Sequence, residues 1–191
     1  TLLSEISSGG YFTCGLTFDG DTACWGRDNF GQSSPNPDNI IGQGVLSTGF
    51  RHNCRIDPDG KLLCWGWDDY QQISAAPADL FSEVSTGYSH TCRIKSDGSV
   101  VCWGDNQRNQ AVPPPGIFTH ISAGMYFNCG IQTDGALYCW GDNLLGQSTP
   151  PEGKFIQVSA GAYHTCGIHD EGTLACWGGI PEVPISPPTG Y

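Results

Sequence analysis

Charged side chains and long apolar runs are scarce in this chain of 191 residues. Charged residues make up 14%, and 8 Lys and Arg stand against 19 Asp and Glu, which gives a formal net charge of −11. A surface of this sign repels phosphate backbones, so we expect no nucleic acid partner. No apolar run approaches the length of a bilayer span, so we expect no membrane insertion of this segment.

Helical periodicity and catalytic signatures are missing as well. The 27 Gly and 13 Pro favour short strands and tight turns over helices. No nucleophile elbow, phosphate-binding loop or HExxH motif is present. We therefore expect no enzyme, no catalytic residue and no cofactor. The chain begins at Thr1 rather than at Met, as a processed or trimmed protein would.

The ten cysteines are the strongest feature that is present, and they occur in pairs separated by ten positions. An even count at constant spacing predicts a disulfide framework and an oxidising compartment. Zinc sites use short Cys-x-x-Cys pairs, which this chain lacks. The pairs are Cys14/Cys24, Cys54/Cys64, Cys92/Cys102, Cys129/Cys139 and Cys166/Cys176.

The cysteine pairs mark five internal repeats. Their first cysteines are 40, 38, 37 and 37 residues apart. A fixed period of this length with strand-type composition indicates a propeller or solenoid. Each repeat reads as a strand such as "EVSTG", a second strand through the first cysteine, a turn, and a third strand into "CWG". We predict a single all-β domain over 1–191 built from five repeats, at about 4–43, 44–80, 81–117, 118–154 and 155–191.

The turn inside each repeat predicts the cysteine pairing. It reads "FDG", "PDG", "SDG", "TDG" or "DEG", which suits a three-residue hairpin loop ending in a left-handed Gly. With 18–20 as the loop, Cys14 faces Cys24 on the adjacent strand, at a separation that suits a disulfide. Apolar cross-strand pairs then share the face of the sulfurs and should be core: Leu16/Thr22, Ile56/Leu62, Ile94/Val100, Ile131/Leu137 and Ile168/Leu174.

A polar loop follows each "CWG" in the first four repeats, with a Gln seven residues after the Trp. The residue before this Gln is Gly31, Gln71, Asn109 or Gly146. Gly and Asn suit a left-handed turn, whereas Gln71 fits poorly.

The repeated motif G-x-x-H-T-C-x-I-x-x-D-G-x-x-x-C-W-G-x-N-x-x-G-Q resembles the repeats of the regulator-of-chromosome-condensation propeller superfamily. With its paired cysteines it is most similar to the extracellular Crinkly-type repeats of plant receptor kinases. The resemblance implies blades of antiparallel strands around an axis, so the five repeats are expected to form a five-bladed β-propeller, whereas many members have seven blades. Five repeats could form a complete ring or part of a larger array. Members include an exchange factor for a small GTPase, a secreted β-lactamase inhibitor and receptor ectodomains, so function stays open.

Two repeated aromatic positions have structural and functional interpretations. His52, His90 and His164 precede the first cysteine by two residues, where the other repeats have Phe12 and Phe127. Because Phe fills the same place, we favour a core position over a metal site. The Trp of each "CWG" should pack between blades rather than stack on sugars. The hairpin turn already requires the Asp-Gly pairs, so we do not expect them to mark a calcium site.

The candidate binding residues are those that break the repeat. Trp67 has no aromatic counterpart, because Arg27, Asp105, Asp142 and Gly179 stand at its place. Exposed aromatic residues are enriched at binding surfaces, although a loop Trp can also pack against a neighbouring loop. The candidates are Trp67, Asp68, Asp69, Tyr70 and, more weakly, Phe30.

Hydroxyl residues beside Pro recur in the links between repeats, whereas no N-x-S/T sequon occurs. Such stretches can carry O-glycans in a secreted protein. The candidate sites are Ser33, Ser34, Ser148, Thr149, Ser186 and Thr189.

These features predict a secreted or cell-surface, non-enzymatic interaction module that binds an extracellular protein partner through propeller loops. One alternative is a structural subunit of an extracellular fibre or matrix in which copies of the chain assemble head-to-tail. Another is a multivalent carbohydrate-binding propeller, with near-equivalent glycan sites between blades.

Overall fold

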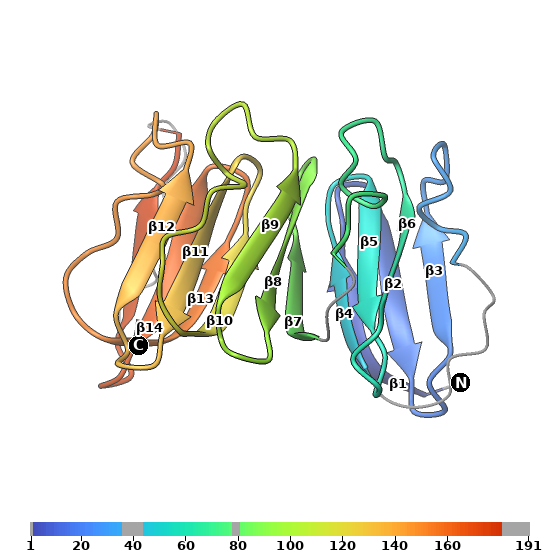
Figure 1. Cartoon of the computed structure of the whole chain (residues 1–191), viewed down its shortest axis with the longest axis horizontal. Coiled ribbons are helices and arrows are strands. Elements are labelled where there is room, and N and C mark those ends of the chain that lie inside the picture. Colours follow the sequence, from blue (N-terminus) through green and yellow to red (C-terminus); the bar gives the residue numbers. More distant parts are fainter. Residues whose placement is uncertain (1, 36–43, 78–80, 181–191) are drawn as a thin grey trace.

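The computed structural model describes residues 2–35, 44–77 and 81–180. Fifteen strands form five three-stranded antiparallel sheets, each built from three consecutive strands with the second in the middle. Figure 1 shows these five blades following one another along the molecule. The strands are β1 (Leu3–Ser8), β2 (Phe12–Thr17), β3 (Thr22–Gly26), β4 (Val45–Thr48), β5 (His52–Ile56), β6 (Leu62–Gly66), β7 (Phe81–Thr86), β8 (His90–Lys95), β9 (Val100–Gly104), β10 (Phe118–Ala123), β11 (Phe127–Gln132), β12 (Leu137–Gly141), β13 (Phe155–Ala160), β14 (His164–His169) and β15 (Leu174–Gly178).

The hairpin of each blade has the predicted register. In the first blade the Gly20 N–H donates to the Thr17 carbonyl at 3.0 Å, and Cys14 lies opposite Cys24. The glycine that ends the loop has a positive φ in all five blades, from 80° to 92°, which a residue with a Cβ rarely adopts.

All five predicted disulfides are present, each within its own hairpin, and the Cα atoms that they link are 4.0 to 4.1 Å apart. This confirms one stapled hairpin per blade. The bonds join Cys14 to Cys24, Cys54 to Cys64, Cys92 to Cys102, Cys129 to Cys139 and Cys166 to Cys176.

The two cysteines of a disulfide differ in burial, which corrects the expectation that this whole face is core. The first cysteine lies on the central strand and is completely buried in four blades: Cys14, Cys54, Cys92 and Cys129. The second lies on the third strand, at the outer edge of the three-stranded sheet, where solvent reaches it. The half-buried second cysteines are Cys24, Cys64, Cys102, Cys139 and Cys176.

Each blade is joined to the next by a buried carbonyl group. The Gln72 carbonyl of the second blade accepts hydrogen bonds from Trp103 Nε1 at 2.8 Å and Thr91 Oγ1 at 3.0 Å of the third blade. The carbonyls of Gln32, Gln110 and Gln147 accept from Trp65, Trp140 and Trp177 in the same way, at 3.0 to 3.1 Å. These four Trp side chains pack between blades, as predicted. Trp25 of the first blade is 47% exposed, so the prediction that it packs between blades was wrong in this structure.

The inner strands approach one another closely. Ser47 Oγ accepts the N–H of Thr86 at 3.0 Å, and Ser7, Ser85 and Ser122 bond to the next inner strand likewise. A Cβ on Gly49 would collide with the carbonyl oxygen of Gly87 in the following blade. The glycine at this place therefore lets the backbones of neighbouring blades meet at the axis.

The predicted core residue on the central strand is buried in the first four blades but only half-buried in the fifth. Leu16, Ile56, Ile94 and Ile131 are all buried beside their disulfides. Their third-strand partners, like the second cysteines, are only half-buried: Thr22, Leu62, Val100 and Leu137.

In the last blade Ile168 is only half-buried and Leu174 is exposed, so their prediction as core residues was wrong in this structure. Figure 1 gives the reason, since the first and fifth blades lie toward opposite ends of the molecule and no described blade covers this face of the fifth.

The histidine positions differ in the same manner. His52 and His90 are completely buried, and their Nε2 atoms lie 2.9 Å from Thr91 Oγ1 and 2.8 Å from Asn128 Oδ1 of the next blade. Burial lowers the pKa of His52 to about 3 and that of His90 to about 4. His164 is exposed on the fifth blade. Among the described residues no cluster of His, Cys, Asp and Glu could hold a metal ion.

The loop after the third strand contains a strained residue. Gln71 has a φ of 60°, where Gly31 and Gly146 stand in other blades with φ of 74° and 77°. A left-handed residue with a Cβ costs about 1–2 kcal/mol. The poor fit of Gln71 predicted from the sequence is thus present as backbone strain.

We predict that Gln71→Gly raises the free energy of unfolding by about 1 kcal/mol. Chemical denaturation with the disulfides intact would measure it. The matched control is Gly31→Gln, which should lose a similar amount, because a Cβ at Gly31 meets no atom within 4 Å and only the backbone conformation is penalised. Equal stability of the Gln71→Gly variant and the parent would contradict the strain.

We predict that the buried histidines make stability fall as the pH is lowered. Their pKa values are lower in the folded chain than in the unfolded chain, where a free His titrates near 6.5. The unfolded chain therefore binds more protons below pH 6.5, and stability is lost from there toward pH 4, by about 1.4 kcal/mol per pH unit for each His.

A double variant separates this effect from the titration of carboxylates. His52→Phe/His90→Phe places Phe where Phe12 and Phe127 stand naturally, so the fold should be kept. Its thermal midpoint should fall less steeply between pH 6.5 and 4 than that of the parent. The exposed His164→Phe variant should keep the parental slope. Parallel slopes for all three proteins would show that the buried imidazoles do not contribute.

Candidate protein-binding face

The structure brings three of the predicted binding residues together on one face. Trp67 and Tyr70 lie in the loop after β6, and Phe30 comes from the corresponding loop of the first blade. The ring centroids of Trp67 and Tyr70 are 5.4 Å apart, and those of Trp67 and Phe30 are 6.1 Å apart. Phe30 and Tyr70 are exposed to 40% and 41%, so the rings are held together while remaining accessible.

Arg51 occupies the centre of this group. It lies in the turn between β4 and β5, and its carbonyl accepts the N–H of Trp67 at 2.9 Å, which ties the turn to the loop. The Arg51 guanidinium carbon is 5.0 Å from the Trp67 ring centroid and 5.1 Å from that of Phe30. It is 5.6 Å from Phe50 and 5.8 Å from Tyr88. We call the six residues Phe30, Phe50, Arg51, Trp67, Tyr70 and Tyr88 the Arg51 cluster.

The cluster continues into a row of rings that crosses four blades. Phe50 stacks on Tyr88 with centroids 4.6 Å apart, and Tyr11 and Tyr126 extend the row on either side at 5.4 and 5.5 Å. Arg27 lies 4.7 Å from the Tyr11 ring centroid. Burial, followed by the neighbouring Tyr88 and Tyr163, raises the pKa of Tyr126 above its ordinary value. These rings therefore present flat apolar faces, with the guanidinium groups of Arg27 and Arg51 beside them.

Sequence reasoning missed Arg51, Phe50 and Tyr88. The signal lay four and three residues before the first cysteine of each repeat. The first position reads Gly10, Phe50, Tyr88, Met125 and Ala162, and the second reads Tyr11, Arg51, Ser89, Tyr126 and Tyr163. The residue at each of these two positions varies between repeats and is often large, whereas the neighbouring position is always small. This contrast would have marked the turn as a surface on which the blades differ.

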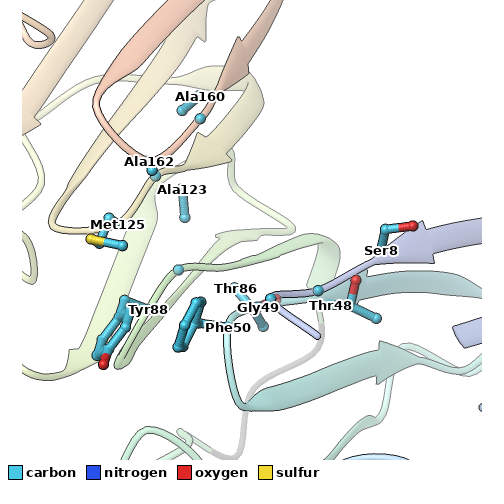
Figure 2. Close-up of a pocket in the computed structure, with 15 residues that line it drawn as sticks. Ser8, Thr48, Gly49, Phe50, Thr86, Tyr88, Ala123, Met125, Ala160 and Ala162 are labelled. Atoms are coloured by element: carbon cyan, nitrogen blue, oxygen red, sulfur yellow. The ribbon is translucent and has the colours of Figure 1, made fainter. Parts of the chain in front are cut away.

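The row borders a hollow at the axis. The turns after the five inner strands line a space of about 200 Å³. Figure 2 shows Phe50 and Tyr88 side by side at its rim, with Met125, Ala123, Ala160 and Ala162 around it and Ser8 and Thr48 further along. Its wall is mostly apolar side chains and glycine backbone, which suits an inserted apolar side chain better than a charged ligand.

The two acidic candidates of the same loop have different environments. Asp68 Oδ1 accepts the N–H groups of Ile73 at 2.6 Å and Ser74 at 3.2 Å. Asp28, Asn106 and Asn143 close the other loops in the same way. The Asp68 carboxylate is thus already used to shape its loop, whereas Asp69 is exposed beside Tyr70. Of the two, Asp69 is the one whose exposure leaves it accessible to a partner.

The predicted O-glycosylation residues belong to these loops too. Ser34 Oγ donates to Asp28 Oδ2 at 2.6 Å, and Ser33, Ser148 and Thr149 also hydrogen-bond within their own loops. Ser186 and Thr189 lie outside the described residues. Glycosylation at these six positions stays a prediction. None of the described elements is a helix of the length and apolarity that a membrane span requires.

Comparisons with known proteins identify the repeat. The family model of the Regulator of chromosome condensation (RCC1) repeat matches residues 4–32, 81–110, 118–147 and 155–179, more than half of the chain. The second repeat, which carries Trp67 and Gln71, lies outside these matches. No curated protein sequence matches the chain significantly.

Solved structures share the arrangement of the blades. The ectodomain of the receptor kinase CR4 from Physcomitrella patens is 28% identical, with a TM-score of 0.79 over 92% of this chain and 51% of that one. The chain thus spans about half the length of that ectodomain. The CRINKLY WD40 ectodomain of the receptor kinase ACR4 from Arabidopsis thaliana is 28% identical, with a TM-score of 0.77 over 98% of this chain and 67% of that one.

A more distant structure, Prp20p from Saccharomyces cerevisiae, shares the fold at 18% identity, with a TM-score of 0.79 over 92% of this chain and 58% of that one. The four repeat matches fall on the first, third, fourth and fifth blades. The chain belongs to the RCC1 repeat family.

Proposed function

We propose that this chain is an extracellular, non-enzymatic interaction module that binds a protein partner through the Arg51 cluster. The observation that carries the proposal is the gathering of six large side chains from three blades on one face, around a single guanidinium. Five disulfides favour an oxidising compartment outside the cell. The two 28%-identical structures are ectodomains of receptor kinases, which supports the same location.

The chemistry of the cluster favours a protein partner. Trp, Tyr and Arg are the residues that most often dominate binding energy at protein interfaces, and the Trp and Tyr rings bury much area with little loss of side-chain freedom. Here the rings already contact one another, so little ordering is needed on binding. The neighbouring axial hollow offers a place for one apolar side chain of the partner.

The Arg51 cluster is not repeated in the other blades, which argues against a lectin with one site per blade. At the places of Tyr70 and Phe30 the third and fourth blades have Arg108 and Leu145, and no second group of this kind occurs in the part of the chain that the structure describes. Near-equivalent glycan sites would need similar side chains in every blade. The non-repeating face supports one partner per chain.

We expect Trp67→Ala and Tyr70→Ala each to weaken partner binding at least tenfold, because each removes an aromatic ring of the Arg51 cluster. Extracellular proteins would be screened against the immobilised chain, and affinities measured by surface plasmon resonance. The matched control is Leu145→Ala, at the place of Tyr70 in the fourth blade. Thermal midpoints of all variants would verify folding. A partner that binds the folded Trp67 and Tyr70 variants as tightly as the parent would show that the site lies elsewhere.

A further inference from the structure

The guanidinium of Arg51 has no ion pair or hydrogen bond among the described residues. Arg108 Nη1, by contrast, lies 3.8 Å from the carboxylate of Asp142. Arg93 Nη2 donates to the Pro77 carbonyl at 2.8 Å. Arg51 is half-buried and lies against aromatic rings, in a chain where 19 Asp and Glu stand against 8 Lys and Arg. Its N–H groups are therefore available to an anionic group of a partner.

The carboxylate that Arg51 lacks corresponds to one position of the repeat. In the fourth blade Asp142 stands at the place of Trp67, and its carboxylate accepts a hydrogen bond from Gln147 Nε2 at 2.7 Å. Gln72 corresponds to Gln147, yet its Nε2 is buried without a hydrogen-bond partner among the described residues. The side chain at position 67 contacts Arg51, so an Asp there would lie near the guanidinium. The second blade thus keeps the donor groups and lacks the internal acceptor.

The rings around Arg51 determine which anion suits it. Its guanidinium carbon lies 5.0 to 5.8 Å from the centroids of four rings, those of Phe30, Phe50, Trp67 and Tyr88. Rings packed on a guanidinium exclude water from it, while its coplanar N–H groups stay available for hydrogen bonds. A carboxylate fits this fork with two parallel charge-assisted bonds. One guanidinium on a chain of net charge −11 suits a single carboxylate better than a doubly charged phosphate.

The axial hollow lies next to this fork and has a different chemistry. Phe50 and Tyr88 line the hollow and also contact the guanidinium, and Figure 2 shows them side by side at its rim. Their backbone N–H groups donate to the carbonyls of Gly87 and Met125 in the following blade, at 3.2 and 3.4 Å. Because these donors at the rim are already used, the hollow favours an apolar group. A carboxylate is therefore directed to Arg51.

We propose that the Arg51 cluster recognises an extended peptide segment that carries a carboxylate and, one or two residues away, an apolar side chain. The carboxylate binds the Arg51 guanidinium, and the apolar side chain enters the axial hollow. One or two residues of extended chain span about 3 to 7 Å, and the guanidinium carbon lies 5.6 and 5.8 Å from the two ring centroids at the rim.

This inference rests on the proposed function, since it names the chemistry of the partner at the same site. The carboxylate can belong to an Asp or Glu side chain or to a C terminus, because the fork of Arg51 binds either in the same way.

Peptide selection on the complete chain, with its disulfides intact, tests the chemistry and the source of the carboxylate. One random library is flanked on both sides by a carrier protein, and a second has a free C terminus. Sequences enriched from the first should carry Asp or Glu within two residues of an apolar residue. Enrichment from the second library alone, with an apolar residue near the end, would identify the terminal carboxylate as the source.

Synthetic peptides from the selection then connect the carboxylate with Arg51. Neutralising it, by an amide side chain or an amidated C terminus, should weaken binding to the parent at least tenfold in fluorescence anisotropy. The same change should have little effect on the Arg51→Gln variant, which lacks the fork. Arg51→Lys should restore only part of the affinity, because an ammonium group does not form the two parallel bonds.

The matched control is Lys61→Gln, which removes a positive charge from the hairpin turn at the other end of the second blade and should bind as the parent does. A photoreactive leucine at the apolar position of the peptide should crosslink to Phe50, Met125 or Ala160, as located by mass spectrometry. Thermal midpoints would verify that each variant is folded.

The outcomes separate this inference from the proposed function. Enriched peptides without a carboxylate, equal losses on the parent and on the folded Arg51→Gln variant, or crosslinks outside the hollow would each overturn the inference. If those peptides still lose affinity for Trp67→Ala, the cluster remains the binding site. Peptides that bind the folded Trp67→Ala variant as tightly as the parent would count against both. If neither library yields an enriched sequence, the cluster does not recognise a short segment and the inference is wrong.

Discussion

The fold depends on a buried carbonyl group that links each blade to the next. A three-stranded sheet of four- to six-residue strands is too small to enclose a core of its own. Its apolar side chains become buried only when the next blade covers them, and the Gln carbonyl that receives the next Trp N–H aligns the two sheets. Because a buried carbonyl without a partner is costly, this bond allows little sliding between blades. The disulfide in each hairpin complements it by restricting the unfolded hairpin, which contributes about 2–3 kcal/mol per blade.

In this repeat architecture the residues that stabilise the fold differ from those that are free to bind a partner. The cysteines, the loop-ending glycines and the Gln recur because every blade needs the same contacts. The turn before each second strand and the loop after each third strand carry fewer such demands, chiefly at the Gln and at the Asp or Asn that closes the loop. Other residues there can differ between blades without loss of the frame, and Arg51 and its surrounding rings lie at such positions in the first three blades. Binding residues commonly lie on loops that a rigid scaffold holds in place.

The candidate site was only partly predictable. Trp67 and Tyr70 were found because they break the repeat along the sequence. Arg51 and Phe50 were missed because their significance comes from rings of two other blades, which lie about 20 to 40 residues away. Asp68 looked like part of a binding surface when read beside Trp67. Comparison across repeats with Asp28 and Asn143 would have shown its loop-closing position, since all three accept backbone N–H groups in the same way.

The sequence by itself determined the hairpins, the disulfide pairing, the strand register and the place of the Trp between consecutive blades. These features are local or repeat at a fixed period, so residue spacing and turn chemistry are sufficient to define them. Tertiary structure alone decided which repeats are buried. Ile131 and Ile168 stand in nearly identical sequences, yet the first is buried and the second is half-exposed. The reason is that a blade face is covered by its neighbour rather than by its own residues, so identical repeats differ in burial according to their position along the array.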